Sequence, residues 1–148
     1  MCIRDSLWYA DLSRAYLDEA DLTHADLASA DLTNANLSSA DLTYAYLGYA
    51  DLTNADLRYA DLTDAYLFDA YLTNACLYSA DLTGADLNYA DLTNADFQDA
   101  DLEDATLVEA DLKFAKFSGA TVTDTNFDDT YWHETMWTDG VRYDSNQS

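Results

Sequence analysis

The feature that most constrains the fold of this chain is an unbroken five-residue repeat. Alanine occupies every fifth position from Ala10 to Ala120, and a leucine or another large apolar residue stands two positions after each alanine. The unit is Ala-Asp-Leu-Thr-X, in which Asn or Tyr sometimes replaces Asp and X varies. Any fold of this chain must therefore give the same two apolar positions the same environment every five residues.

Neither an α-helix nor a straight β-strand satisfies this period. In an α-helix five residues advance by about 500°, so successive leucines would rotate by about 140° and form no common stripe. In a straight strand side chains alternate between two faces, so an odd period would turn every second leucine outward. The pattern works if the chain turns a corner every five residues, with Ala and Leu pointing inward and the Thr-X pair at the corner.

A second period sets the number of sides. Asp-Leu-Thr recurs every ten residues, from Asp21-Leu22-Thr23 to Asp91-Leu92-Thr93, with Tyr71 as an exception. This alternation of two kinds of pentad requires an even number of sides, so four sides fit and three do not. The periods predict an all-β solenoid, a quadrilateral parallel β-helix with about 20 residues per coil and nearly seven coils.

The repeat resembles that of the pentapeptide-repeat family over roughly residues 7–139. The resemblance implies that the quadrilateral β-helix is right-handed. From Thr125 onward threonine replaces alanine, and large aromatic residues replace leucine. We expect this last coil, from about residue 125, to cap the rod, because the end of a solenoid exposes unpaired strand edges. The predicted capping side chains are Phe127, Trp132 and Trp137.

The two ends of the chain fall outside the repeat. Residues 1–6 (MCIRDS) resemble a translated sequencing-adapter end rather than an ordinary start, so we expect a non-native leader and a natural N-terminus that lies upstream. Residues 137–140 provide a turn, and residues 140–148 form a polar tail that we expect to fray. The family also suggests a homodimer through the C-terminal coil, with Tyr131 and Met136 near the contact.

The charge of the chain restricts its partners. It contains 29 acidic and 6 basic residues, a formal net charge of −23. Binding to nucleic acid or an anionic membrane requires the opposite sign, so we expect neither. A protein partner that is basic, or that normally binds nucleic acid, fits better. No apolar run reaches membrane-spanning length and no signal peptide is visible. The cellular compartment stays unknown, with the cytoplasm only weakly favoured.

Charges and aromatic rings are unevenly distributed over the four expected sides. The pentad at 20–24 and its counterparts every twenty residues, called the acidic face below, carry nine acidic and no basic residues. The pentad at 25–29 and its counterparts, called the aromatic face, carry six acidic residues, no basic ones and a cluster of aromatics. The predicted interaction surface comprises Tyr44, Tyr46, Tyr49, Tyr66, Phe68, Tyr89, Asp41, Asp61 and Asp81. Stacking of the tyrosines for stability alone is the simpler interpretation.

The aspartate column of the acidic face also carries an electrostatic expectation. Stacked coils lie about 4.8 Å apart, a spacing at which neighbouring carboxylates repel by about 0.9 kcal/mol in water. Such repulsion disfavours the charged form, so we expect raised pKa values in the folded state for the column of Asp21, Asp41, Asp61, Asp81 and Asp101.

No pattern for catalysis, cofactors or metals is found, so the chain is predicted not to be an enzyme. No serine-histidine-aspartate, HExxH or phosphate-loop arrangement occurs, and two cysteines form no ligand cluster. The first hypothesis is a structural or protein–protein interaction module. The second is a DNA mimic, since some family members that confer quinolone resistance resemble duplex DNA and bind DNA gyrase or topoisomerase IV. The rod has about one net charge per 1.4 Å, near the one per 1.7 Å of DNA. Ice binding is a third, weaker alternative.

Overall fold

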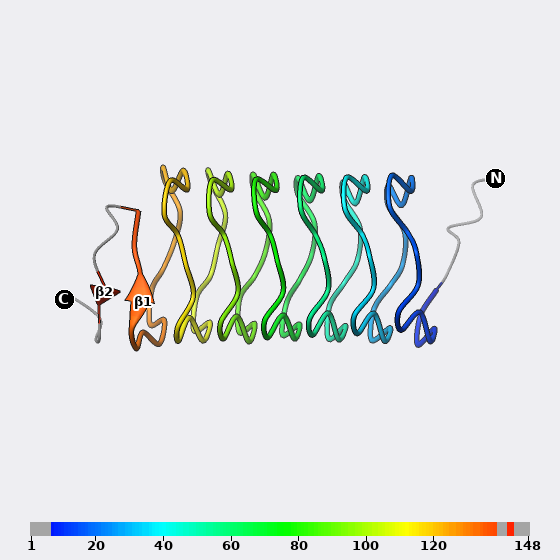
Figure 1. Cartoon of the computed structure of the whole chain (residues 1–148), viewed down its shortest axis with the longest axis horizontal. Coiled ribbons are helices and arrows are strands. Elements are labelled where there is room, and N and C mark those ends of the chain that lie inside the picture. Colours follow the sequence, from blue (N-terminus) through cyan, green and yellow to red (C-terminus); the bar gives the residue numbers. More distant parts are fainter. Residues whose placement is uncertain (1–6, 139–141, 144–148) are drawn as a thin grey trace.

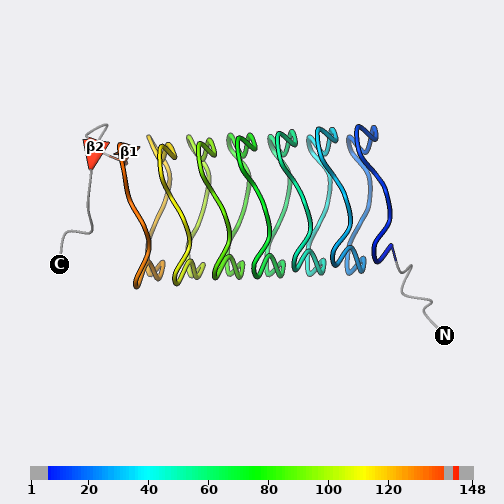
Figure 2. The same ribbon diagram turned by 90° about the horizontal axis from the view of Figure 1, so that it is seen from below.

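The chain is a rod of stacked coils, seen from two sides in Figures 1 and 2. The computed structural model describes residues 7–138 and 142–143. Bridges join residues twenty positions apart in parallel, for example Asp11 with Asp31, Tyr16 with Asn36, and Asp21 with Asp41. One turn of the rod therefore takes twenty residues, or four pentads. The predicted leader at residues 1–6 lies outside the described residues.

Backbone hydrogen bonds follow one rule in the pentads between residues 30 and 114. Around Leu42, the Asp41 N–H donates to Ala20 O of the preceding coil at 2.9 Å, and the Leu42 N–H donates to Asp61 O of the next coil at 2.7 Å. The Tyr44 N–H also donates to the next coil, while the Ala45 N–H donates to Leu42 O at 2.9 Å and closes the corner. Four of the five N–H groups thus have backbone acceptors.

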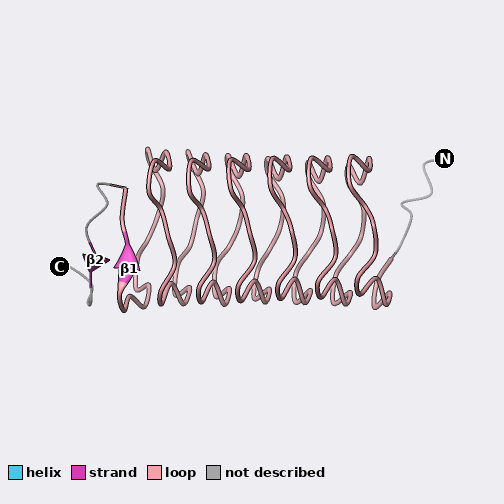
Figure 3. Cartoon of the chain, viewed as in Figure 1, coloured by secondary structure: helices cyan, strands magenta, loops and turns pink. Residues whose placement is uncertain are grey.

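Among the residues that the structure describes, regular strands occur only near the C-terminal end. Strand β1 spans Thr135–Met136 and strand β2 spans Arg142–Tyr143; the two pair antiparallel, Thr135 with Tyr143 and Met136 with Arg142. Elsewhere each side of a coil contributes one bridged residue before the chain turns, so Figure 3 shows loop throughout the described coils. Pairing by residues 142–143 differs from the fraying expected of the tail.

The bore of the rod is filled by the alanines and leucines of the repeat. Every repeat alanine from Ala25 to Ala120 is at most 8% exposed, and the leucine or phenylalanine two positions after each of them, from Leu27 to Phe117, is 0% exposed. The inward placement of both repeat positions is therefore confirmed. Each buried leucine contributes about 1.5–3 kcal/mol of burial free energy, before the entropic cost of ordering the chain is subtracted.

The corners use a backbone conformation that sequence reasoning missed. Residue X of each pentad has a positive φ: 24 non-glycine residues lie between 48° and 63°, and Gly84 and Gly119 lie at 69° and 79°. The left-handed conformation is costliest for β-branched residues. The sequence does contain a signal for this conformation. No Val, Ile or Thr occupies any of these X positions, and the threonines of the repeat stand one position earlier.

The last coil fills the same register with different side chains. Thr130 and Thr135 are 1% and 0% exposed at positions where the shaft has alanine. The Thr135 hydroxyl donates to Leu112 O at 2.6 Å, and the Thr125 hydroxyl donates to Leu102 O at 2.7 Å. These bonds to the preceding coil allow a buried polar group where the repeat otherwise requires alanine.

Aromatic rings are stacked beneath this coil. Phe117 lies parallel to Phe97, with centroids 4.8 Å apart, and Trp137 lies 5.2 Å from Phe117 and 5.1 Å from Phe127. Trp132 contacts Trp137 at 4.5 Å. The three side chains predicted to cap the rod are thus brought together on the core; all three are partly buried.

Candidate protein-interaction surface

Where a pentad carries Asp after its alanine, this side chain supplies the acceptor that the backbone lacks. The remaining N–H, at the Thr position, donates to the side chain two residues earlier: Thr23 to Asp21 at 3.2 Å and Thr43 to Asp41 at 3.0 Å. The Thr43 hydroxyl donates to the same Oδ1 at 2.5 Å. Asp is therefore used here as a local hydrogen-bond acceptor as well as a surface charge.

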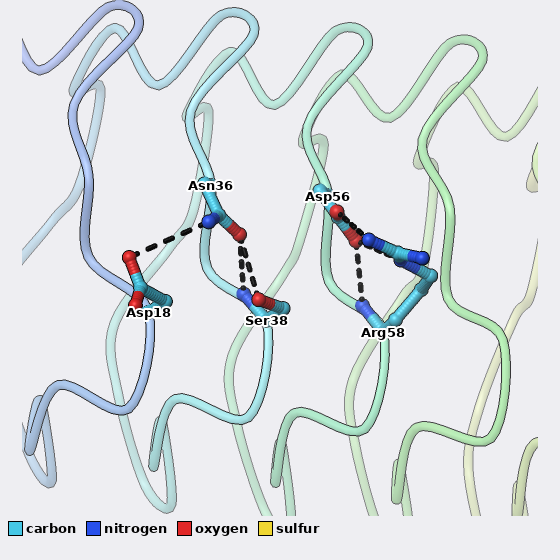
Figure 4. Close-up of polar contacts among 5 residues, drawn as sticks. All are labelled: Asp18, Asn36, Ser38, Asp56 and Arg58. Carbon is cyan, nitrogen blue, oxygen red and sulfur yellow. Dashed lines mark hydrogen bonds and ion pairs between the residues drawn. The ribbon is translucent and has the colours of Figure 1, made fainter.

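Asparagine performs the same role without charge. Figure 4 shows Asn36 Oδ1 accepting from the Ser38 N–H at 3.1 Å and from the Ser38 hydroxyl at 2.8 Å. In the next coil Asp56 Oδ1 accepts from the Arg58 N–H at 3.2 Å. Since the amide oxygen of Asn36 replaces a carboxylate, replacement of Asp by Asn removes a charge and retains the acceptor.

These bonds overturn the expected rise in pKa along the aspartate column for Asp41. The Thr43 hydroxyl, and then the Thr43 N–H, hold the pKa of the Asp41 carboxyl below its ordinary value of 3.8. Ser13 lowers the pKa of the Asp11 carboxyl in the same way. Two short donors contact the charged oxygen directly, whereas the neighbouring carboxylates act across water, where repulsion is weak.

Basic side chains of the coils lie away from the acidic and aromatic faces. Arg58, Lys113 and Lys116 pair with Asp56, Asp111 and Asp96 at 2.6, 2.6 and 3.2 Å. Arg58 holds the pKa of the Asp56 carboxyl below its ordinary value. Such exposed pairs contribute little to stability, but they neutralise part of the charge on these two sides. The acidic and aromatic faces carry no Lys or Arg in their described pentads.

The aromatic face presents two groups of exposed rings in contact. Tyr46 and Tyr66 stack in parallel, with centroids 5.0 Å apart and planes inclined by 6°. Phe68 lies 5.9 Å from Tyr49 and 5.2 Å from Tyr89 in edge-to-face contacts. All five rings are exposed, from 36% for Tyr46 and Phe68 to 54% for Tyr49. The structure therefore brings the predicted aromatic residues of this face together.

Tyr44 lies at the corner between the two faces, in a column of its own. His24 stacks on Tyr44 with centroids 5.0 Å apart, and the Asp64 carboxylate, as acceptor from the hydroxyl, raises the pKa of Tyr44. Gly84 leaves room for that carboxylate: a Cβ on Gly84 would lie 2.5 Å from Asp64 Oδ1. Asp64 and Gly84 are thus part of the surface that sequence reasoning missed.

The acidic column predicted from the sequence is also assembled. Asp41 bridges Asp61, and Asp61 bridges Asp81, so the three residues stand in successive coils. No group of three or more His, Cys, Asp or Glu side chains among the described residues is arranged to hold a metal ion. The described residues also include no helix long and apolar enough to cross a membrane.

These features define a repeat β-helix whose distinctive chemistry is all on its surface. The chain belongs to the pentapeptide-repeat family: the model described as "Pentapeptide repeats" matches in eight copies, at residues 6–38, 35–74, 65–104, 75–113 and 95–131. No curated protein matches the chain in sequence.

Solved structures of pentapeptide-repeat proteins resemble it. Rfr23 from the cyanobacterium Cyanothece 51142 is 32% identical with a TM-score of 0.62, over 62% of this chain and 63% of that chain. HetL from Nostoc sp. strain PCC 7120, a protein involved in heterocyst differentiation regulation, is 31% identical with a TM-score of 0.53, over 93% and 78%. QnrB1, a plasmid-mediated fluoroquinolone resistance protein in a trypsin-treated form, has a TM-score of 0.73 at 21% identity, over 94% and 75%. These neighbours imply a right-handed β-helix.

Proposed function

We propose that this protein is a non-enzymatic interaction module, a rod that presents an acidic, tyrosine-rich surface to a basic protein partner. The observation that carries the proposal is the asymmetry of the surface: two adjoining faces lack Lys and Arg in their described pentads and also hold the exposed Tyr46, Tyr49, Tyr66 and Phe68. Exposed aromatic clusters on a polar surface are typical of protein interfaces. Membership of a family of surface-presenting solenoids agrees with this role.

The architecture we propose for this module is a right-handed quadrilateral rod of nearly seven coils, comprising residues 7–139. Phe127, Trp132 and Trp137 close its C-terminal end, as their contacts with the core suggest. A homodimer through this end, as some relatives form, competes with β2, which pairs with β1 on that side. Light scattering at increasing protein concentration tests the dimer.

The interaction surface is tested by titration with a ten-residue peptide of alternating lysine and serine, followed by calorimetry at low salt. Replacing Asp41, Asp61 and Asp81 together with Asn should weaken binding about tenfold, because three exposed ion pairs each contribute about 0.2–1 kcal/mol. The Asn side chains keep the local acceptor, as Asn36 shows, so the fold should persist.

A second variant separates the aromatic contribution. Tyr46→Ser with Tyr66→Ser should also weaken peptide binding. The matched control, Tyr59→Ser with Tyr78→Ser, removes a tyrosine pair on the face that carries Arg58 and should leave affinity unchanged. Equal losses in the two variants would refute the assignment of the surface.

DNA mimicry is the alternative that the charge of the rod favours. The net charge of −23 on a narrow rod gives a line charge similar to that of duplex DNA. QnrB1 shares only the fold at this identity, so it does not extend its role to this chain. Inhibition of DNA supercoiling by DNA gyrase in the presence of the protein, relieved in the triple Asn variant, would establish this alternative.

A further inference from the structure

Gly48 leaves an opening in the middle of the aromatic face. It stands at the Thr position of its pentad, between Thr43 and Thr53 of the neighbouring pentads. Apart from its chain neighbours, the only atom within 4 Å of a Cβ built on Gly48 is Phe68 O, at 3.6 Å. Positive φ values occur at Gly84 and Gly119 but not at Gly48. The coil itself therefore does not require glycine here.

Aromatic rings border this opening. Tyr46 stands two residues before Gly48, Tyr49 follows it, and Phe68 occupies the equivalent position in the next coil. Tyr49 and Phe68 meet edge to face at 5.9 Å and are 54% and 36% exposed. Exposed ring faces attract an ammonium or guanidinium group, and the alkyl stem of a lysine or arginine fits over a surface without side-chain cover.

The backbone at this place has donors without their usual acceptor. Where Asp or Asn stands two residues earlier, the N–H at the Thr position donates to its side chain, as Thr43 does to Asp41 at 3.0 Å. At Gly48 and Phe68 the residue two positions earlier is a tyrosine, Tyr46 or Tyr66, which offers no carboxylate. The Gly48 and Phe68 N–H groups, one coil apart, therefore lack this side-chain acceptor.

The surrounding charge selects the sign of the occupant. In their column, Tyr46 is bridged to Asp26 and Tyr66 to Asp86, so an aspartate stands at each end of the tyrosine pair. The described pentads of the aromatic and acidic faces contain no Lys or Arg that could neutralise them. A cationic side chain is complementary to this site, whereas a phosphate or carboxylate would be repelled.

We propose that the Gly48 opening binds a lysine or arginine side chain from an extended basic segment of a partner protein. The side chain lies over Gly48 against Tyr49 and Phe68. This inference rests on the proposed function and deepens it by naming the subsite and the chemistry of its ligand.

The glycines allow a direct test, because the chain contains only four. Protein labelled with 15N-glycine is titrated with the alternating lysine–serine peptide at low salt. The Gly48 amide signal should shift most. The amide signal of Gly119, which lies on the opposite side of the rod, should stay in place. A glutamine–serine peptide of equal length should move neither signal.

Gly48→Thr restores the usual residue of the repeat and fills the opening. It should weaken the peptide about three- to tenfold while leaving the melting temperature at or above that of the parent. Ser38→Thr, the same kind of change at the same pentad position on the opposite side, is the matched control and should leave affinity unchanged. Phe68→Leu, which keeps an apolar side chain but loses the ring, should also weaken binding.

The outcomes separate this inference from the proposed function. Peptide binding with an unmoved Gly48 signal, or with unchanged affinity in Gly48→Thr, would overturn the subsite and leave the acidic interaction surface standing. Equal shifts of Gly48 and Gly119 would mean diffuse electrostatic attraction and also overturn it. A Gly48 shift on concentrating the protein alone would assign the opening to a second copy of the chain. Absence of any binding would refute both proposals.

Discussion

The shaft between residues 25 and 120 and the end coil at residues 125–138 share one five-residue register but are stabilised differently. In the shaft, small Ala and larger Leu side chains alternate in a bore without polar groups, and each coil repeats the one before. In the end coil, threonine hydroxyls bond to carbonyls of the preceding coil, and phenylalanine and tryptophan rings gather on the core. The stability of the shaft is thus a sum of equivalent contacts between neighbouring coils. The stability of the end coil depends instead on particular side chains, for which no equivalent contacts further along the rod can substitute.

The largest effect is expected from removing the end coil. Deletion of residues 125–148 would uncover the strand edge of the preceding coil and the ring of Phe117. The truncated rod should melt well below the parent and aggregate with rising concentration, as light scattering would report. A truncated protein that remains monomeric with the melting temperature of the parent would show that the end coil has no capping role.

Overpacking the shaft should have the next largest effect. Ala60→Leu or Ala65→Leu adds volume at positions that are 1% exposed, at a cost of about 1–3 kcal/mol or more. Leu107→Phe or Leu112→Phe should cost less than about 1.5 kcal/mol, because the bore already holds the stacked pair Phe97 and Phe117. Thermal melts of the four variants compare the two positions, and equal losses would contradict the difference in available volume.

Thr135→Val tests the distinctive bond of the end coil with little change of shape. The variant loses the hydroxyl that donates to Leu112 O at 2.6 Å, at an expected cost of about 0.5–1.5 kcal/mol. Leu112 O still accepts from the Ala115 N–H at 3.1 Å, so no buried carbonyl is left without a donor. Chemical denaturation gives the difference, and an unchanged or higher stability would show that threonine here is tolerated rather than used.

The smallest expected effect is that of replacing Asp41 of the shaft with Asn. Asp41→Ala removes the acceptor of the Thr43 N–H and should cost about 0.5–1.5 kcal/mol, whereas Asp41→Asn should cost less because Asn36 already fills this role. Since the pKa of Asp41 is lower in the folded state, its stabilising contribution is present above the ordinary value of 3.8 and is lost as pH falls through the folded value. The melting temperatures of the parent and of Asp41→Asn, measured between pH 7 and pH 3, should therefore approach each other toward pH 3.

If Asp41→Asn were more stable than the parent at neutral pH and low salt, this prediction would be contradicted. Repulsion along the column would then outweigh the hydrogen bonds from Thr43. Moderate salt would also raise the melting temperature of the parent more than that of the variant, because screening acts on the charges and leaves the bonds intact.

The candidate surface was only partly predictable. Columns follow from the twenty-residue coil, so the assembly of Asp41 with Asp61, and of Tyr46 with Tyr66, was correctly expected. The pairing of Tyr44 with Asp64 and the place left for it by Gly84 depend on side-chain directions at a corner. Periodicity specifies which residues are neighbours, but it does not specify how their side chains turn.

By itself the sequence determined the register of the rod: a five-residue period admits neither helix nor straight strand, so Ala and Leu had to face inward and the chain had to turn at X. Only the tertiary structure decided what the outward residues do. It assigned the aspartates to the N–H groups that no backbone carbonyl reaches, which reverses the predicted shift in the pKa of Asp41. It also paired residues 142–143 with β1 and left Gly48 uncovered among aromatic rings. The physical reason is that register follows from the periodic burial of apolar groups, whereas polar contacts depend on side-chain directions and on distances of a few tenths of an ångström, which the period does not specify.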